Sequence, residues 1–301
     1  MQNRADLHRH LDGSLRESTA MELATELNIS VPKNLYFKPH MDLGTALSHF
    51  EFTLSLLQNT KNIARVGKEI CEDANADGVE LLEIRFGPHL HQREGLRLEE
   101  IIDAALEGVD GKAGLILCGL YGDDPKLIKS FVEIAKDRLG VVGLDLAGGP
   151  DSSQEFKLED YSEAFSLAAE YGMGRTVHAS EGRSPEEIIT AVTKLQAQRI
   201  GHGVTLLENP KALELVLEND IVIEACPTSN LQCGVIPSFQ EHPIGKWLDL
   251  GVKACLNTDN TFFSQVSSSS EHQNALSING MDEQKLSKAI ENGLAAGFTR
   301  R

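Results

Sequence analysis

Residues Asp6–Gly13, with the sequence DLHRHLDG, are the stretch from which the organisation of this chain is inferred. We predict a short strand here that ends in a turn at Gly13. Because side chains alternate across a strand, His8 and His10 point to the same side. Two neutral imidazoles side by side provide half of a zinc site. Taken alone, the stretch fits a polar strand with two solvated histidines equally well, so the rest of the chain has to decide.

The composition is that of a globular protein, with 41% hydrophobic and 24% charged residues among 301. This length fits one large α/β domain or two ordinary ones, and because no linker is visible we predict one domain over residues 1–301. The formal net charge is −17. No cluster of Lys and Arg is visible of the kind that binds phosphate backbones. We therefore expect neither a nucleic-acid polymer nor a membrane surface as a partner.

Five cysteines are spread along the chain. Their odd number and wide spacing favour buried free thiols in a reducing compartment over a disulfide framework. No CxxC pair is present, so a thiolate zinc site is not expected. The first residues lack the apolar run of a signal peptide, and no apolar run is long enough to span a bilayer. We therefore expect a cytoplasmic protein.

From Gly78 onward the chain repeats one pattern: a glycine or polar turn, a β-rich run, polar residues and an amphipathic helix. This alternation indicates parallel strands joined by right-handed crossovers. With the first strand, eight are predicted, the later ones over 79–86, 114–120, 141–146, 175–178, 199–202, 221–226 and 252–256. Eight βα units in this length predict a (β/α)8 barrel of the TIM type. An open doubly wound sheet is the alternative, but residues 12–15 (DGSL) do not form its glycine-rich phosphate loop.

Three helices are predicted between the first and second strands, over 15–28, 42–58 and 60–76. This is more than a βα unit needs, and such an excursion often covers a site, although extra packing would also explain it. Further helices are predicted over residues 98–109, 126–138 and 185–195. The serine-rich residues 267–270 are predicted to be a short loop.

Polar residues with metal-binding or acid–base chemistry stand at the carboxyl ends of the predicted strands, where a barrel has its active site. They are His8, His10, Asp12, Asp145, His178, Glu181, His202 and Asp259. Three histidines and an aspartate suit zinc and leave a position open for water, whose pKa zinc lowers to about 7. A spare carboxylate, Glu181, could carry a proton to the leaving group. Any one of these histidines alone would be a hydrogen-bonded core residue, but their coincidence favours a metal site. No lysine ends the fourth strand, so we expect one Zn2+ per chain.

With these residues the chain resembles the adenosine deaminase family of zinc-dependent barrel hydrolases. The matching segments, in family order, are DLHRHLDGS (6–14), EIRFGPH (83–89), GLDLAG (143–148), TVHASE (176–181), RIGHG (199–203), CP (226–227) and LNTDN (256–260). The resemblance therefore covers almost the whole chain. It implies hydrolytic deamination of adenosine to inosine and ammonia, and the same reaction on 2′-deoxyadenosine.

The resemblance also implies roles for the site residues. The zinc ligands would be His8, His10, His178 and Asp259. Of the catalytic residues, His202 and Asp259 would orient the attacking hydroxide, and Glu181 would protonate N1 of the purine.

Substrate contacts are implied for His10, Asp12, Gly148 and Asn260. The Gly148 amide would face N3 of the base and Asn260 would face N7. The Asp12 carboxylate would bind the 5′-hydroxyl of the ribose, although a turn or N-cap role is the alternative for this residue. The partner is thus a small purine nucleoside.

Three positions depart from the family pattern. Asn260 replaces a second Asp, but a neutral amide still donates to N7. Thr261 replaces a proline, and Ser180 stands where Gly is common, so that its side chain could crowd the purine. These departures leave open the same chemistry on adenine or on an N6-substituted or 5′-modified adenosine. A catalytically idle barrel would be expected if ligands were missing, and none is.

Two further matches are given structural roles. Glu83 and Arg85 alternate on the second strand, and because buried charges must be paired we expect an internal ion pair. Residues 226–230, with the sequence CPTSN, are expected to form a turn beneath the site.

Overall fold

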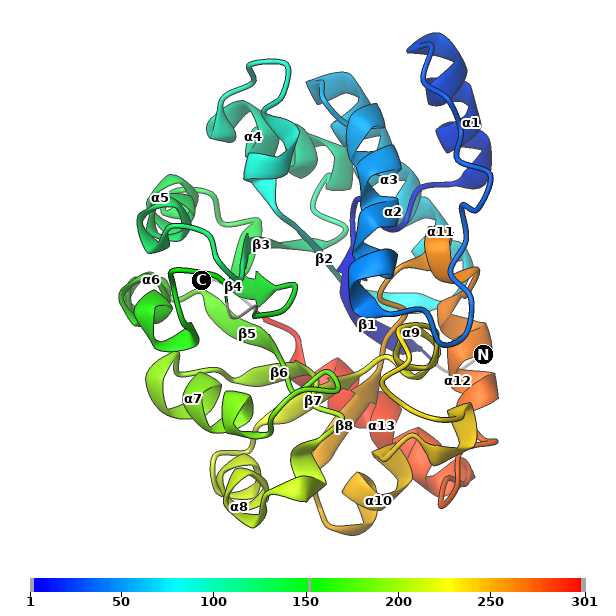
Figure 1. Ribbon diagram of the computed structural model, residues 1–301, viewed down its shortest axis with the longest axis vertical. Coiled ribbons are helices and arrows are strands. Elements are labelled where there is room, and N and C mark those ends of the chain that lie inside the picture. The colour runs from blue at the N-terminus through cyan, green and yellow to red at the C-terminus, as the bar shows by residue number, and fades with distance from the viewer. Residues whose placement is uncertain (1–2, 151–152, 299–301) are drawn as a thin grey trace.

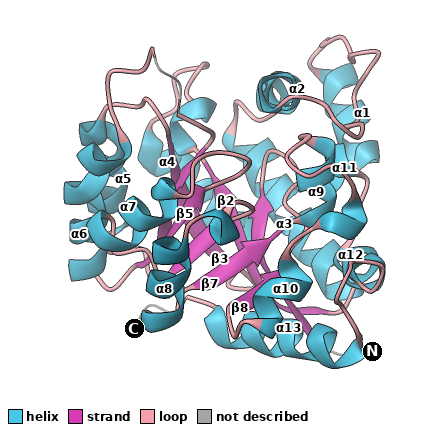
Figure 2. Ribbon diagram, turned by 60° about the horizontal axis from the view of Figure 1, so that its bottom comes forward, coloured by secondary structure: helices cyan, strands magenta, loops and turns pink. Residues whose placement is uncertain are grey.

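The computed structural model describes residues 3–150 and 153–298. Eight parallel strands follow one another in the order β1 to β8, and helices surround them (Figures 1 and 2). The strands are β1 (Arg4–His10), β2 (Val79–Phe86), β3 (Gly114–Leu120), β4 (Val141–Ala147), β5 (Gly174–Ala179), β6 (Arg199–His202), β7 (Val222–Ala225) and β8 (Lys253–Leu256). The predicted (β/α)8 barrel is confirmed, and each predicted strand is present.

Helices α1 to α3 lie between β1 and β2, as the sequence predicts. The α-helices are α1 (Glu17–Glu26), α2 (Leu43–Leu56), α3 (Thr60–Ala76), α4 (Leu98–Val109), α5 (Pro125–Ala135), α6 (Ser162–Glu170), α7 (Glu186–Lys194), α8 (Pro210–Glu218), α9 (Pro227–Gln232), α10 (Ile244–Asp249), α11 (Thr261–Ser264), α12 (Ser268–Ala275) and α13 (Glu283–Ala296). Short 3-10 helices occupy η1 (Pro88–His91), η2 (Leu158–Tyr161), η3 (Leu206–Glu208) and η4 (Phe239–Glu241). In the described part of the chain, no helix combines the length and apolar character needed to cross a membrane.

The serine-rich stretch predicted as a loop is instead the beginning of α12. The Ser267 side chain accepts a hydrogen bond from the backbone N–H of Ser270 and caps the helix. Serine favours this position because its hydroxyl satisfies an N–H that has no partner within the helix. The expectation was wrong because serine marks turns and helix N-termini alike.

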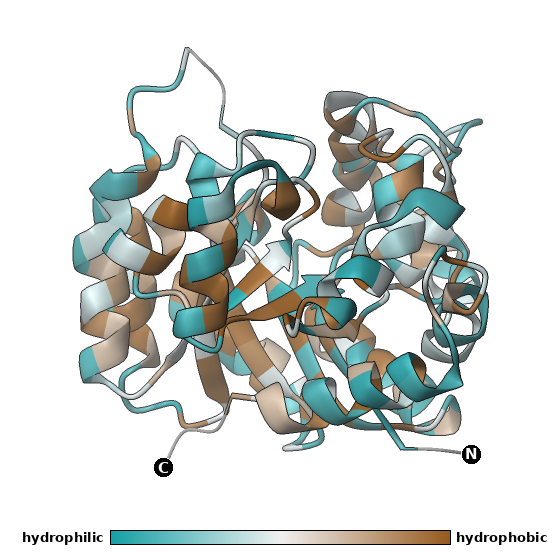
Figure 3. Ribbon diagram, turned by 90° about the horizontal axis from the view of Figure 1, so that it is seen from below, coloured by the Kyte–Doolittle hydropathy of each residue, from teal (hydrophilic) through white to brown (hydrophobic). Residues whose placement is uncertain are grey.

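The core lies between the strands and the surrounding helices. Strand β4 is buried at every position, as expected for a parallel strand with both faces covered, which explains its nearly continuous apolar run. Figure 3 shows hydrophobic strands inside and hydrophilic outer faces on the helices. Apolar side chains therefore fill the core, and polar side chains stand at the carboxyl ends of the strands.

The barrel closes where β1 meets the end of β8. Arg9 and Asp259 form a parallel bridge, the Asp259 N–H donates to the His8 carbonyl at 2.8 Å, and the His10 N–H donates to the Asp259 carbonyl at 2.8 Å. The backbone thus brings His8 and His10 of β1 to the same place at the rim as Asp259, which is distant from them in sequence. These are residues that the sequence assigns to the metal site.

Candidate active site

A cavity of about 430 Å3 lies at the carboxyl ends of the strands. Most of the predicted site residues line it: His10, Asp12, Gly148, His178, Glu181, His202, Asp259 and Asn260. Helix α2 contributes Leu43, Leu47, Phe50 and Leu54 to the wall. The excursion between β1 and β2 therefore does cover the site.

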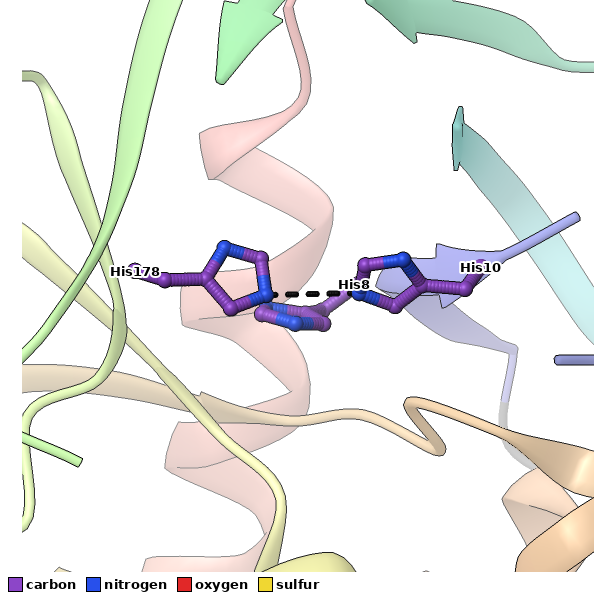
Figure 4. A group of neighbouring side chains, drawn as sticks. All are labelled: His8, His10 and His178. Carbon is purple, nitrogen blue, oxygen red and sulfur yellow. Dashed lines mark hydrogen bonds between the residues drawn. The ribbon is translucent and has the colours of Figure 1, made fainter. Parts of the chain in front are cut away.

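Three imidazoles converge beside this cavity (Figure 4). One ring nitrogen of each of His8, His10 and His178 lies within 4.8 Å of the others. The Nε2 atoms of His10 and His178 are 3.3 Å apart. The Nε2 atom of His8 is buried and has no hydrogen-bond partner among the described residues. Burial lowers the pKa of His8 and of His10 well below the ordinary value, so these rings are neutral, the form that binds metals.

Asp259 supplies an oxygen to the same place. Its Oδ1 atom lies 3.5 Å from Nε2 of His10 and 3.9 Å from Nε2 of His8. Three imidazole nitrogens and one carboxylate oxygen that face one another, with a buried nitrogen left unpartnered, fit a zinc ion. The site residues predicted as metal ligands are thus brought together.

Two buried carboxylates accept hydrogen bonds from the Nδ1 atoms of His8 and His178. His8 Nδ1 donates to Glu224 at 2.7 Å, and His178 Nδ1 donates to Asp145 at 3.0 Å. Arg85 bonds both carboxylates, at 2.9 Å to Asp145 and 2.8 Å to Glu224. Carboxylates in this position set the tautomer and aim Nε2 at the metal. Glu224 is not predicted by the sequence motifs, although it is a lone charge within the apolar run 221–226.

The expected pair between Glu83 and Arg85 does not form. Both side chains are buried, but Glu83 pairs with Arg199, while Arg85 reaches across to Asp145 and Glu224. Arg199 also donates to Glu224 at 2.7 Å. Alternate residues of one strand point the same way, so each meets a partner on another strand inside the barrel.

Glu181 and His202 lie next to each other in the wall of the cavity. Oε1 of Glu181 lies 3.7 Å from Nε2 of His202, and Oε2 lies 3.6 Å from Nη1 of Arg183. Burial raises the pKa of Glu181 above its ordinary value, although the Arg183 charge opposes this. A carboxyl group of raised pKa can hold and deliver a proton near neutral pH. Burial also lowers the pKa of His202 to about 3, so this ring is neutral.

The predicted substrate contacts are also at the cavity. Oδ1 of Asp12 is buried and has no hydrogen-bond partner among the described residues, and the N-cap residue of α1 is Arg16, not Asp12. Gly148 has φ +75°, a conformation that favours glycine. The Asn260 amide donates to Asp259 Oδ1 at 2.8 Å and retains a second N–H.

The structure differs from two expectations, that the Ser180 side chain could crowd the purine and that residues 226–230 form a turn. The Ser180 side chain is fully buried, donates to the Ser184 carbonyl at 3.0 Å and does not line the cavity. It therefore does not crowd a ligand, although its φ of 59° is one that glycine adopts more easily. The segment expected as a turn beneath the site continues into helix α9, from which Ser229 lines the cavity and Asn230 bonds His202.

Comparisons with known proteins identify the family of the chain and agree with its fold. The chain matches the family Adenosine deaminase over residues 3–301. It is 36% identical to adenosine deaminase from Clostridium acetobutylicum, over 98% of this chain and 92% of the relative. Similar folds include adenine deaminase from Arthrobacter aurescens (TM-score 0.89, 20% identity, 99% of this chain and 94% of that chain). Another is a zinc-bound amidohydrolase from Burkholderia ambifaria (TM-score 0.87, 23% identity, 99% and 86%). The chain therefore belongs to the adenosine deaminase family, as its motifs predict.

Proposed function

We propose that this protein hydrolyses adenosine and 2′-deoxyadenosine to the corresponding 6-oxo nucleosides and ammonia. The observation that carries the proposal is the convergence of His8, His10, His178 and Asp259 beside a cavity that also holds Glu181. Both halves of a hydrolytic deamination are provided there: a metal site for the nucleophile and an acid for the base.

One zinc ion per chain would be held by those four side chains. When bound, zinc supplies a hydroxide at neutral pH because it lowers the pKa of bound water. Two carboxylates and Arg85 already fix the orientation of His8 and His178, so the ligand set is preorganised.

The remaining groups act on the purine. Glu181 holds a proton for N1, which makes C6 electrophilic, and His202 orients the oxygen that adds there. The Gly148 amide faces N3, the free N–H of Asn260 faces N7, and the unpartnered Asp12 oxygen accepts from the 5′-hydroxyl. C6 loses its amino group as ammonia when the C–N bond breaks.

A second candidate is the same chemistry on a 5′-modified adenosine, or on another 6-aminopurine such as adenine or an N6-substituted nucleoside. Arg93 lines the cavity and is paired with Glu51. The Arg93 side chain is 41% exposed, so a substrate phosphate could take the place of Glu51 as its partner.

A deamination screen over adenine, adenosine, 2′-deoxyadenosine, AMP and their N6-methyl forms tests the proposal, with the zinc content of the same sample measured. We expect about one zinc per chain and the highest kcat/KM for the unmodified nucleosides. A preference for AMP that Arg93→Ala removes would establish the second candidate. Absence of zinc would contradict both candidates, and so would a failure of every compound to release ammonia or, from the N6-methyl forms, methylamine.

The compartment is also a proposal. All five cysteines are buried free thiols, which suits the reducing cytoplasm.

A further inference from the structure

A chain of hydrogen bonds runs from the beginning of α10 to the catalytic His202. The backbone N–H of Ile244 donates to Nδ1 of His242 at 3.2 Å. Nε2 of His242 lies 3.2 Å from Oδ1 of Asn230, and Nδ2 of Asn230 lies 3.0 Å from Nδ1 of His202. The three side chains are at most 2% exposed, so water does not compete for these bonds.

The backbone N–H of Ile244 can only donate, and this fixes which atom donates and which accepts in every hydrogen bond of the series. A backbone N–H only donates, so Nδ1 of His242 accepts and the ring carries its proton on Nε2. That N–H needs Oδ1 of Asn230 as its acceptor, which turns Nδ2 of the amide toward His202. The opposite amide orientation would place a proton on Nδ1 of His242, against the Ile244 N–H. Nδ1 of His202 therefore accepts, and its proton is on Nε2.

We propose that Asn230 and His242 are positioning residues that hold the proton of His202 on Nε2, the nitrogen that faces the cavity. The inference rests on the proposed function and assigns a further step of it. His202 meets the oxygen at C6 as a hydrogen-bond donor, and proton delivery to N1 is left to Glu181. A donor held in advance stabilises the negative charge that develops on that oxygen.

Neighbouring groups hold Asn230 and His242 in place, as a positioning role requires. Asn230 lies in the first turn of α9, where its own N–H donates to the Cys226 carbonyl at 2.9 Å. The His242 ring packs edge-on against the fully buried Trp247, with 5.4 Å between ring centres. His242 does not line the cavity, so its effect on catalysis must pass through Asn230.

Asn230→Asp is the direct test, because it keeps the shape of the side chain and replaces the donor by an acceptor. We expect the His202 proton to move to Nδ1, and kcat to fall by about 10²- to 10⁴-fold, the range for losing a correctly placed acid–base group or tautomer. KM should change little, since no substrate contact is removed. Long-range 1H–15N spectra of the histidine-labelled zinc enzyme report the tautomer directly.

Substitutions of His242 provide a matched pair that leaves the cavity untouched. In His242→Gln the terminal amide can replace the Nε2–H donor, so we expect the Nε2–H tautomer of His202 and nearly full kcat. In His242→Leu the Asn230 amide is free to turn over, so a mixture of tautomers and a lower kcat are expected. Zinc content, measured for each variant, should stay at the wild-type value.

A wild-type His202 with its proton on Nδ1 would overturn the inference, as would an Asn230→Asp enzyme whose tautomer changes while kcat does not. Equal losses in His242→Gln and His242→Leu would also overturn it, because they would indicate a packing role. Failure of the proposed function looks different: the wild-type tautomer would be Nε2–H, but no purine would release ammonia.

Discussion

Glu271 links α12 to the first turn of α9, the helix that carries Asn230. Its Oε1 atom accepts from the Thr228 N–H at 2.8 Å, and its Oε2 atom accepts from the Thr228 hydroxyl. Glu271 is 1% exposed, and burial raises the pKa of its carboxyl group from 4.5 to about 7. The folded protein therefore binds this proton more tightly than the unfolded chain does.

The consequence is a loss of stability with rising pH. The contribution of Glu271 is complete below about pH 4.5, the ordinary pKa, and is lost as the pH rises through about 7. Because one pKa unit is worth about 1.4 kcal/mol, the difference is on the order of 3 kcal/mol at high pH. Glu271→Gln keeps an acceptor for the Thr228 N–H and cannot ionise. We expect this variant to be more stable than wild type at pH 8 by an amount of that order, and about equal at pH 4.5.

Urea denaturation at several pH values, with zinc saturating, measures this difference in the free energy of unfolding. Glu291→Gln is the control, because it makes the same chemical change at a side chain that is 66% exposed. A difference between Glu271→Gln and wild type that stays constant from pH 4.5 to 8 would refute the reasoning.

The other predictions concern the site itself. Glu181→Gln should retain zinc and lose turnover by about 10²- to 10⁴-fold, since a neutral amide cannot give a proton to N1; metal analysis with steady-state kinetics checks this, and retained turnover would contradict the acid role. Glu224→Gln should weaken zinc binding by about 10- to 100-fold through His8, measured by competition with a chelator; unchanged affinity would show that Glu224 does not support the metal site. Ser180→Gly should leave KM for adenosine unchanged and alter stability by no more than about 1 kcal/mol, because relief of the left-handed backbone opposes loss of one hydrogen bond; an altered KM would show that this side chain does reach the substrate.

The sequence predicted the strands and the gathering of polar side chains at one rim for the same reason. Each βα unit repeats a local pattern, and in a parallel barrel the carboxyl ends of all strands meet at one rim. His8, His178 and Asp259 could therefore be brought together without knowledge of the register. Family motifs then added roles for Glu181 and His202 that alternation alone does not give.

The groups that support those residues were harder to predict because they depend on which strands face each other across the interior. Glu83 and Arg85 are neighbours on one strand, yet Glu83 pairs with Arg199 on β6 and Arg85 with Asp145 and Glu224. His242 lies in an irregular segment with no periodic pattern. Its link to His202, through Asn230, is visible only in the three-dimensional structure.

The supporting groups couple the imidazoles of His8 and His178 to each other. Arg85 bonds the carboxylates behind both His8 and His178, so the orientations of these two ligands are not independent. A substitution of Glu224 changes one of the two carboxylates that Arg85 binds. Because the other is Asp145, which accepts from His178, we expect the substitution to affect His178 as well. Residues joined in one hydrogen-bonded network have non-additive effects. His8 and His178, which stand in separate motifs of the sequence, are therefore held as one unit through the guanidinium of Arg85.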